Sequence, residues 1–136
     1  MKSVLVYYYI MNIREYLVSK KEEIKQLEVK PRLIDIEPNK NFIISIVGPR
    51  RSGKTFFLYF LIKKFNLSDK DFLFVNFEEI SDNLEDLPLI HKEIYGDLPE
   101  YLFFDEIQSL DNWEKFLYRL YESKRYYIFV TGSFSK

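Results

Sequence analysis

The sequence ISIVGPRRSGKTFFLYFL, from Ile44 to Leu61, joins a run of β-branched residues to a long apolar stretch through a short loop. This loop contains two of the chain's 4 glycines, Gly48 and Gly53, on either side of two adjacent arginines. It fits the pattern G-x-x-x-x-G-K-[ST], in which backbone N–H groups fold around a phosphate. A side chain at either glycine would obstruct that approach or forbid the backbone angles. The stretch therefore predicts a strand, a phosphate-binding loop and a helix.

The polar residues of this loop have roles that phosphate binding suggests. Lys54 would reach the β- and γ-phosphates of a nucleotide and act in catalysis, and Thr55 would offer its hydroxyl to Mg²⁺. The following helix would direct the positive end of its dipole at the same anion. Arg50 and Arg51 occupy variable positions, and we expect them to be solvated side chains that add to the local positive field. The expected nucleotide-binding residues are Gly48, Pro49, Arg50, Arg51, Ser52, Gly53, Lys54, Thr55 and Phe56.

A second motif, YLFFDEIQ at residues 101–108, is an apolar strand that ends in two acids. P-loop proteins hold Mg²⁺ at such a strand end, so Asp105 is expected to be a metal ligand together with Thr55. Glu106 could polarise an attacking water and is the candidate general base. This pair favours ATP hydrolysis over phosphorylation of a small molecule or a GTPase switch. An acidic surface turn is the alternative.

A third motif, IFVTGS, places Thr131 and Ser133 at the end of the last predicted strand. The ligand crevice of an open α/β sheet lies at the carboxyl ends of its strands. A hydroxyl at that place could bind the γ-phosphate or the attacking water. An ordinary turn containing Gly132 explains the same residues equally well.

The rest of the chain alternates between strands and helices. Periodicity and apolar runs predict strands over 42–47, 72–77, 101–106 and 126–132, helices over 12–29, 55–65 and 112–123, and a loop followed by a helix over 78–95. The alternation predicts an α/β fold with a parallel sheet and right-handed crossovers. The strand over 42–47 is apolar on both faces, which is typical of a strand buried on both sides.

The composition narrows the classes of partner. Lys and Arg number 20 and Asp and Glu 21, so the net charge is -1 and no global field favours nucleic acid or a membrane surface. Nucleic acid is therefore not indicated by charge, although a local patch stays open. Cysteine is absent, which excludes disulfides and thiol zinc sites and favours a cytoplasmic location. His91 is the only histidine and is expected on a helix surface.

The apolar segment at residues 3–11 is too short to span a bilayer. It also lacks the small-residue cleavage site of a signal peptide. Two interpretations stay open: an extra strand, or a start-site artefact with translation beginning at Met11.

Three stretches together resemble the AAA+-like ATP-binding domain of a large archaeal and bacterial ATPase family. They are IISIVGPRRSGKTFFLYFLI, YLFFDEIQSLDNWEKFLYRLYE and YYIFVTGSFSK, and the most specific mark is Asp105–Gln108 followed by Trp113. The resemblance covers roughly residues 12–136. It implies a three-layer P-loop fold with sheet order 5-1-4-3-2, of which strand five is missing here. Longer members complete the ATPase core, and many add a nuclease-like C-terminal domain.

We expect a strand-and-helix extension at residues 1–30 and a P-loop ATPase core at 31–136 that is truncated at its C-terminal end. The expected function is an ATP-binding, Mg²⁺-dependent ATPase module of AAA+ type, without indication of its client. A non-hydrolysing nucleotide-binding interaction fragment and a small-molecule P-loop kinase are the alternatives. We expect ATP binding with poor turnover, because no arginine finger or second sensor can be named. The strand over 42–47 would lie at a sheet edge that residues 3–11 or a partner in a homo- or hetero-oligomer could cover.

Overall fold

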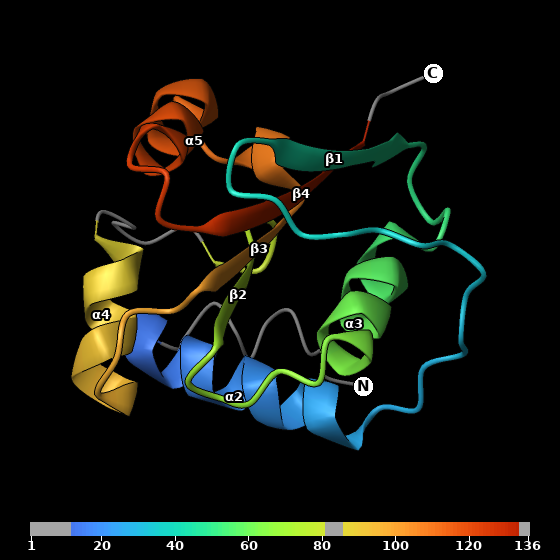
Figure 1. Cartoon of the computed structure of the whole chain (residues 1–136), viewed down its shortest axis with the longest axis horizontal. Coiled ribbons are helices and arrows are strands. Elements are labelled where there is room, and N and C mark those ends of the chain that lie inside the picture. The colour runs from blue at the N-terminus through green and yellow to red at the C-terminus, as the bar shows by residue number, and fades with distance from the viewer. Residues whose placement is uncertain (1–11, 81–85, 134–136) are drawn as a thin grey trace.

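A computed structural model describes residues 12–80 and 86–133. Strands and helices alternate along the chain (Figure 1). Their order is α2 (Ile13–Gln26), β1 (Ile43–Gly48), α3 (Lys54–Lys64), β2 (Phe72–Asn76), α4 (Leu87–Tyr95), β3 (Tyr101–Asp105), the 3₁₀ turn η1 (Ile107–Ser109), α5 (Trp113–Glu122) and β4 (Tyr127–Ser133).

The four described strands form one parallel sheet in the order β1-β4-β3-β2. This arrangement confirms the predicted α/β fold, and its order is the 1-4-3-2 part of the order that the resemblance implies. The register pairs Gly48 with Ser133 and Asn76 with Asp105. Since the strands are parallel, their carboxyl ends all lie at the same end of the sheet. The predicted site residues lie at this end.

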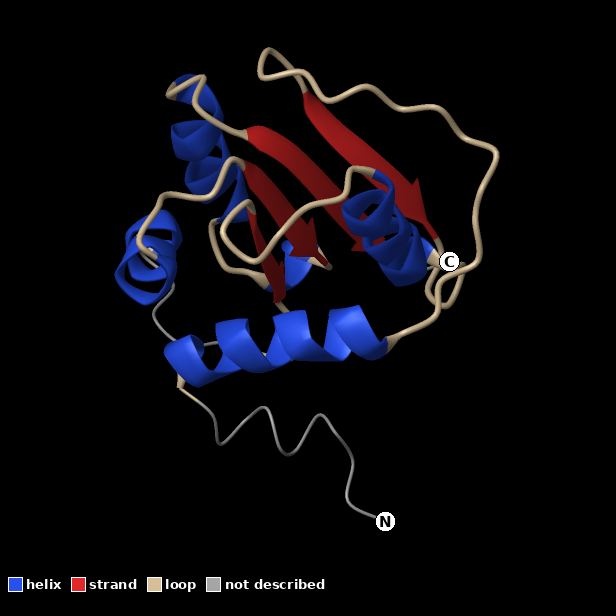
Figure 2. Cartoon of the chain, turned by 60° about the horizontal axis from the view of Figure 1, so that its bottom comes forward, coloured by secondary structure: helices blue, strands red, loops and turns tan. Residues whose placement is uncertain are grey.

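Helices cover both faces of the sheet. On one face α3 packs its apolar side chains against Phe74, Phe103 and Phe129. On the other face α5 and α4 contact a core that includes Leu102 and Val130. The helix α2 contributes to both clusters and runs along the β2 side of the sheet (Figure 2). The result is a three-layer arrangement with α2 closing one side.

The helix α2 begins at a capping motif that its sequence contains. Asn12 accepts a hydrogen bond from the backbone of Glu15, and the Glu15 side chain accepts one from the backbone of Asn12, forming a capping box. The helix ends at Gln26, ahead of Pro31, and the prediction of a helix over 12–29 was therefore too long at its C-terminal end. The expectations for residues 3–11 lie outside the described residues, and the division into an extension and a core stays a prediction.

The prediction that the strand over 42–47 is buried on both sides is wrong. β1 lies at an edge of the sheet, the position that the resemblance implies for it, and within the described part of the chain it pairs only with β4. Val47 is 66% exposed and Phe42, just before the strand, is 63% exposed. An apolar sequence alone does not tell a central strand from an edge strand, because burial depends on the neighbouring elements.

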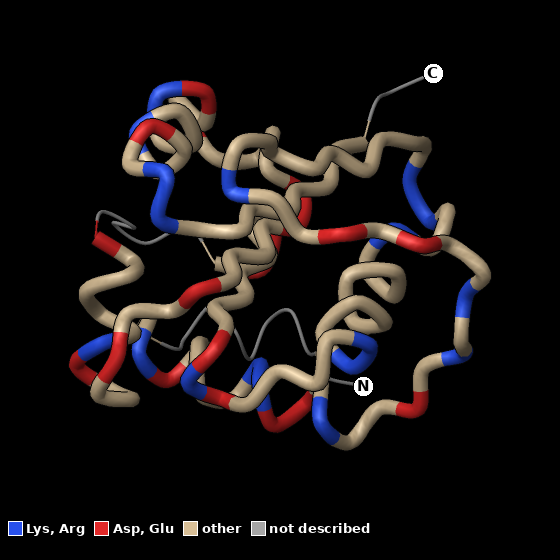
Figure 3. The backbone as a smooth tube through the Cα atoms, in the orientation of Figure 1, with Lys and Arg blue, Asp and Glu red and all other residues tan. Residues whose placement is uncertain are grey.

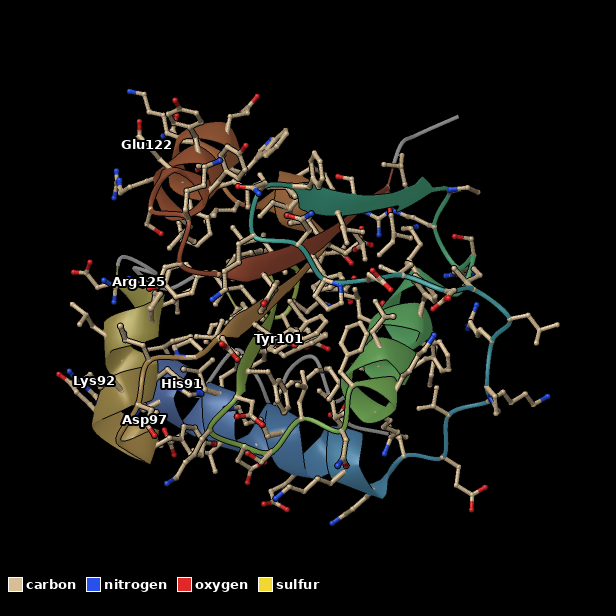
Figure 4. All side chains as sticks on the ribbon, in the orientation of Figure 1. His91, Lys92, Asp97, Tyr101, Glu122 and Arg125 are labelled. Carbon is tan, nitrogen blue, oxygen red and sulfur yellow. The ribbon has the colours of Figure 1, made fainter. Side chains whose placement is uncertain are left out.

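The prediction that His91 lies on a helix surface is also wrong. His91 is completely buried where α4 packs against α2 and the start of β2 (Figure 4). Its Nδ1 lies 2.9 Å from the carbonyl oxygen of Asp97 and its Nε2 lies 3.0 Å from that of Phe72. A neutral imidazole carries one N–H, so the ring can donate to one of these two carbonyl groups at a time.

Charged residues of both signs are interspersed over the fold (Figure 3). Within the described ranges, no helix is long and apolar enough to cross a membrane.

Candidate functional site

The loop between β1 and α3 is tightly closed. Gly53 has φ +89°, a left-handed conformation that a side chain would strain, and the helix begins at the next residue. A Cβ atom placed on Gly48 would lie 3.2 Å from Oγ of Ser52. The two glycines therefore leave a small cradle of backbone groups at the N-terminus of α3, as phosphate binding requires.

The side chain of Lys54 folds back into this cradle. Its Nζ donates hydrogen bonds to the carbonyl oxygens of Gly48 at 3.0 Å and Pro49 at 2.6 Å, and lies 3.4 Å from Oγ of Ser52. All three partners are uncharged, and none of the described carboxylates forms an ion pair with Lys54. The cradle thus holds a cation without a counter-charge, which is the arrangement that favours an anionic ligand.

Asp105 is the buried centre of the site. Its Oδ2 accepts hydrogen bonds from Oγ1 of Thr55 at 2.7 Å and from Nδ2 of Asn76 at 3.3 Å. Its Oδ1 accepts one from Oγ1 of Thr131 at 2.5 Å. Burial raises the pKa of Asp105 above its ordinary value, and the hydrogen bonds from Thr131 and Thr55 act in the opposite direction. A carboxylate beside a hydroxyl is the hard oxygen set that Mg²⁺ prefers, so these residues fit that ion.

Glu106 directly follows β3 and is held by hydrogen bonds to the end of β4. Its backbone has φ 53° and its N–H donates to Oγ1 of Thr131 at 2.9 Å. Its carboxylate accepts hydrogen bonds from Oγ of Ser133, at 2.6 and 3.0 Å from its two oxygens, and from Nε2 of Gln108 at 3.2 Å. Gln108 also accepts a hydrogen bond from the backbone of Ser133 at 3.3 Å. Ser133 and Gln108 therefore fix the direction of the Glu106 carboxylate.

The structure brings several of the residues singled out in the sequence into direct contact at the strand ends. The contacting residues are Thr55, Asp105, Glu106, Thr131 and Ser133. Arg50 instead pairs with Glu78, with 2.7 Å between Nη1 and Oε2. Arg51 has φ 63° in the loop, and Phe56 is 46% exposed on α3.

Two further residues reach the site that the sequence did not reveal. Asn76, at the end of β2, donates to Asp105, and its position as the first polar residue after the apolar run FLFV is a signal that could have found it. Arg32 lies before β1 and places Nη2 3.4 Å from the carbonyl oxygen of Gly53. No local pattern marks Arg32, because the contact depends on how the connecting segment runs past α3.

The sheet order, the closed loop and the acidic strand end define an α/β domain of P-loop NTPase type. The family described as "AAA domain" matches residues 40–136, and the chain therefore belongs to this family. This membership confirms the resemblance to AAA+-like ATPases and indicates a nucleotide-binding, ATPase-like domain.

One relative is an uncharacterized protein of Methanocaldococcus jannaschii, which is 42% identical over 128 residues. The match covers 90% of this chain and 28% of that protein, so the chain spans little more than a quarter of its relative's length. No solved structure matches the chain.

Proposed function

We propose that this chain is an ATP-binding module that takes ATP with Mg²⁺ at the carboxyl ends of its strands. One observation supports this most strongly: Oγ1 of Thr55 lies 2.7 Å from Oδ2 of Asp105. This contact joins the glycine loop to the end of β3, so a phosphate in the loop and a cation at Asp105 would be neighbours. The family membership, which indicates a nucleotide-binding domain, supports the same proposal.

The residues of the loop have separate tasks in this proposal. The backbone from Gly48 to Gly53, including Pro49 and Ser52, would surround the phosphates, and Lys54 would exchange its carbonyl partners for phosphate oxygens. Phe56 would follow at the start of α3. Arg50 and Arg51 would contribute positive charge near the loop. Thr55 and Asp105 would hold Mg²⁺, which supplies positive charge against the phosphate groups when bound.

Glu106 is the candidate base of an ATPase reaction. In this role it would orient a water molecule and accept its proton. In this structure Ser133 and Gln108 donate hydrogen bonds to its carboxylate, and its backbone N–H donates to Thr131. Turnover would require Glu106 to exchange the hydrogen bond from Ser133 for one from water. We therefore propose ATP binding as the primary activity and slow hydrolysis as the secondary one; a binding module without turnover is the second candidate.

The exposed edge of β1 is the proposed surface for association with another chain or a further strand. Its single partner among the described strands is β4, and Val47 exposes most of its side chain there. A module that depends on ATP and Mg²⁺ would work in the cytoplasm.

A nucleotide titration tests the proposal. Lys54→Ala removes the cation from the loop, and because a hydrogen bond to a charged group contributes about 1.5–3 kcal/mol, ATP affinity should fall by about 10- to 100-fold. Lys63→Ala is a matched control, since Lys63 is an exposed lysine near the end of the same helix. Equal ATP affinity of the wild type and Lys54→Ala would remove the phosphate-loop assignment.

A further inference from the structure

The helix α2 lies outside the part of the chain that matches the AAA domain family, yet it reaches the candidate site. Tyr16 on this helix is completely buried. Its hydroxyl donates to Oε1 of Glu79 at 2.8 Å and accepts a hydrogen bond from the backbone N–H of Asn76 at 2.9 Å. The ring stays in the core while the oxygen contacts the last residue of β2.

The position of β2 explains why Asn76 needs this partner. Among the described strands β2 lies at an edge, and the N–H of the next residue, Phe77, donates to the carbonyl oxygen of Asp105 on the inner side. Because successive N–H groups of a strand point to opposite sides, the N–H of Asn76 faces outward. Tyr16 satisfies this outward group, as a further strand otherwise would.

The remaining polar groups of Asn76 are also held. Its Oδ1 accepts from the backbone of Glu78 at 2.9 Å, and its carbonyl oxygen accepts from that of Glu79 at 3.0 Å. Its Nδ2 is thereby directed to Oδ2 of Asp105, the oxygen that also accepts from Thr55. A continuous series of hydrogen bonds therefore runs from α2 through Asn76 to the proposed magnesium ligand.

A second residue of α2 supports the same contact. Lys20 is 2% exposed, and its Nζ lies 3.0 Å from Oε1 of Glu79, the oxygen that accepts from Tyr16. Lys20 also pairs with Glu23 on its own helix at 3.0 Å. Glu79 is thus held on α2 by two side chains one helical turn apart.

We propose that Tyr16 is a positioning residue of the nucleotide site, which orients the Asp105 carboxylate through Asn76 and makes α2 a part of that site. The inference rests on the proposed binding of Mg²⁺ and ATP. It has a reciprocal consequence, because two coupled equilibria must favour each other equally. Binding of Mg²⁺ with ATP should therefore strengthen the docking of α2 against β2.

The test is a titration of ATP affinity with and without Mg²⁺. Tyr16→Phe removes one oxygen atom and keeps the ring. Because a neutral hydrogen bond has a modest net worth, the gain in affinity that Mg²⁺ provides should fall by about three- to tenfold, with Mg²⁺-free affinity unchanged. Tyr121→Phe is the matched control, since that hydroxyl donates to the carbonyl oxygen of Asn41 away from the site, and this variant should retain the full Mg²⁺ effect.

A double-mutant cycle identifies the route of the effect. Asn76→Ala should reduce the Mg²⁺ effect at least as much as Tyr16→Phe, and the double variant should resemble Asn76→Ala alone, because both residues act in one series. Additive losses would show that Tyr16 acts by another route and would overturn the inference. If Tyr16→Phe fails to fold, as judged by circular dichroism, Asn76→Ala decides: an unchanged Mg²⁺ effect overturns the inference.

Hydrogen exchange provides a readout that does not depend on affinity. ATP with Mg²⁺ should slow amide exchange across Ile13–Gln26 in the wild type, and this protection should be smaller in Tyr16→Phe. A wild type that binds ATP with Mg²⁺ while Tyr16→Phe behaves identically would overturn the inference alone. A wild type without Mg²⁺-dependent ATP binding would overturn the proposed function and, with it, this inference.

Discussion

At the scale of single residues, Lys21 and His91 form a buried pair of bases that the proposed reaction does not use. Nζ of Lys21 lies 2.8 Å from Nε2 of His91, donates to the carbonyl oxygen of Asp69 and faces the ring of Tyr95 at 3.8 Å. Burial lowers the pKa of Lys21 from 10.5 to about 7, and burial together with the charge of Lys21 lowers the pKa of His91 below 6.5. Both groups therefore resist protonation in the folded state.

This pair predicts that the protein loses stability on acidification. Both folded-state pKa values lie below the unfolded ones, so the unfolded chain binds more protons. Because of Lys21, the free energy of unfolding decreases as the pH falls from about 10.5 to about 7. Because of His91, it decreases further below about 6.5. The other charged groups that act on Lys21 are Asp69, Asp71 and Lys25.

Urea unfolding at a series of pH values measures the effect. The free energy of unfolding should rise between about pH 7 and about pH 10.5, the interval in which Lys21 contributes most. Lys21→Met keeps an unbranched side chain of similar length and should flatten that rise. Equal slopes in the two proteins would show that Lys21 is already charged in the folded state.

The two adjacent acids at the end of β3 should differ in their roles. Asp105 contacts Thr55 and Thr131, so Asp105→Asn removes the negative charge of the proposed metal ligand and should abolish the Mg²⁺ dependence of ATP affinity. Glu106→Gln keeps a side chain of the same shape and should retain ATP affinity while losing any turnover. Fluorescent-nucleotide titrations and phosphate release measure the two quantities. Identical behaviour of the variants would refute this division of roles.

At the scale of elements, the sequence was informative wherever the signal is local. The glycine pattern around Lys54 gave the loop and the start of α3, and apolar runs located the four strands. His91 and β1 were misjudged because burial is decided by packing partners distant in the sequence. The Tyr16–Asn76 contact could not be predicted for the same reason, since 60 positions separate the two residues. The acids at residues 105 and 106 were noticed together, but only the fold shows that Asp105 contacts Thr55 while Glu106 contacts Ser133.

The cap of α2 is the testable feature at this scale. Asn12 and Glu15 exchange hydrogen bonds at the N-terminus of the helix, and loss of an N-cap side chain typically costs about 1 kcal/mol. Asn12→Ala should therefore lower the free energy of unfolding by about this amount. Glu28→Ala, an exposed position beyond the end of the helix, is the control and should change it little. Chemical denaturation compares the three proteins, and an unchanged midpoint for Asn12→Ala would mean that α2 does not need its cap.

At the scale of the whole molecule, the sheet has two edges that are treated differently. The β2 edge is covered by α2, whose Tyr16 satisfies the outward N–H of Asn76. The β1 edge has no such cover among the described residues, and it carries exposed apolar side chains at Phe42 and Val47. Unpaired strand edges with apolar residues favour pairing with another chain. The asymmetry indicates which side of the module would meet a partner.

The last prediction follows from this asymmetry: the isolated chain should self-associate through β1 as its concentration rises. Val47→Lys places a charge on the strand edge, a device by which natural edge strands avoid pairing, and should shift the protein toward the monomer. Tyr118→Lys introduces the same charge at a residue on α5 that is 59% exposed, away from that edge, and should leave association unchanged. Sedimentation velocity over a range of concentrations distinguishes the variants. A wild type that stays monomeric throughout, or equal association of Val47→Lys and wild type, would show that the β1 edge is not the surface through which this chain associates with itself.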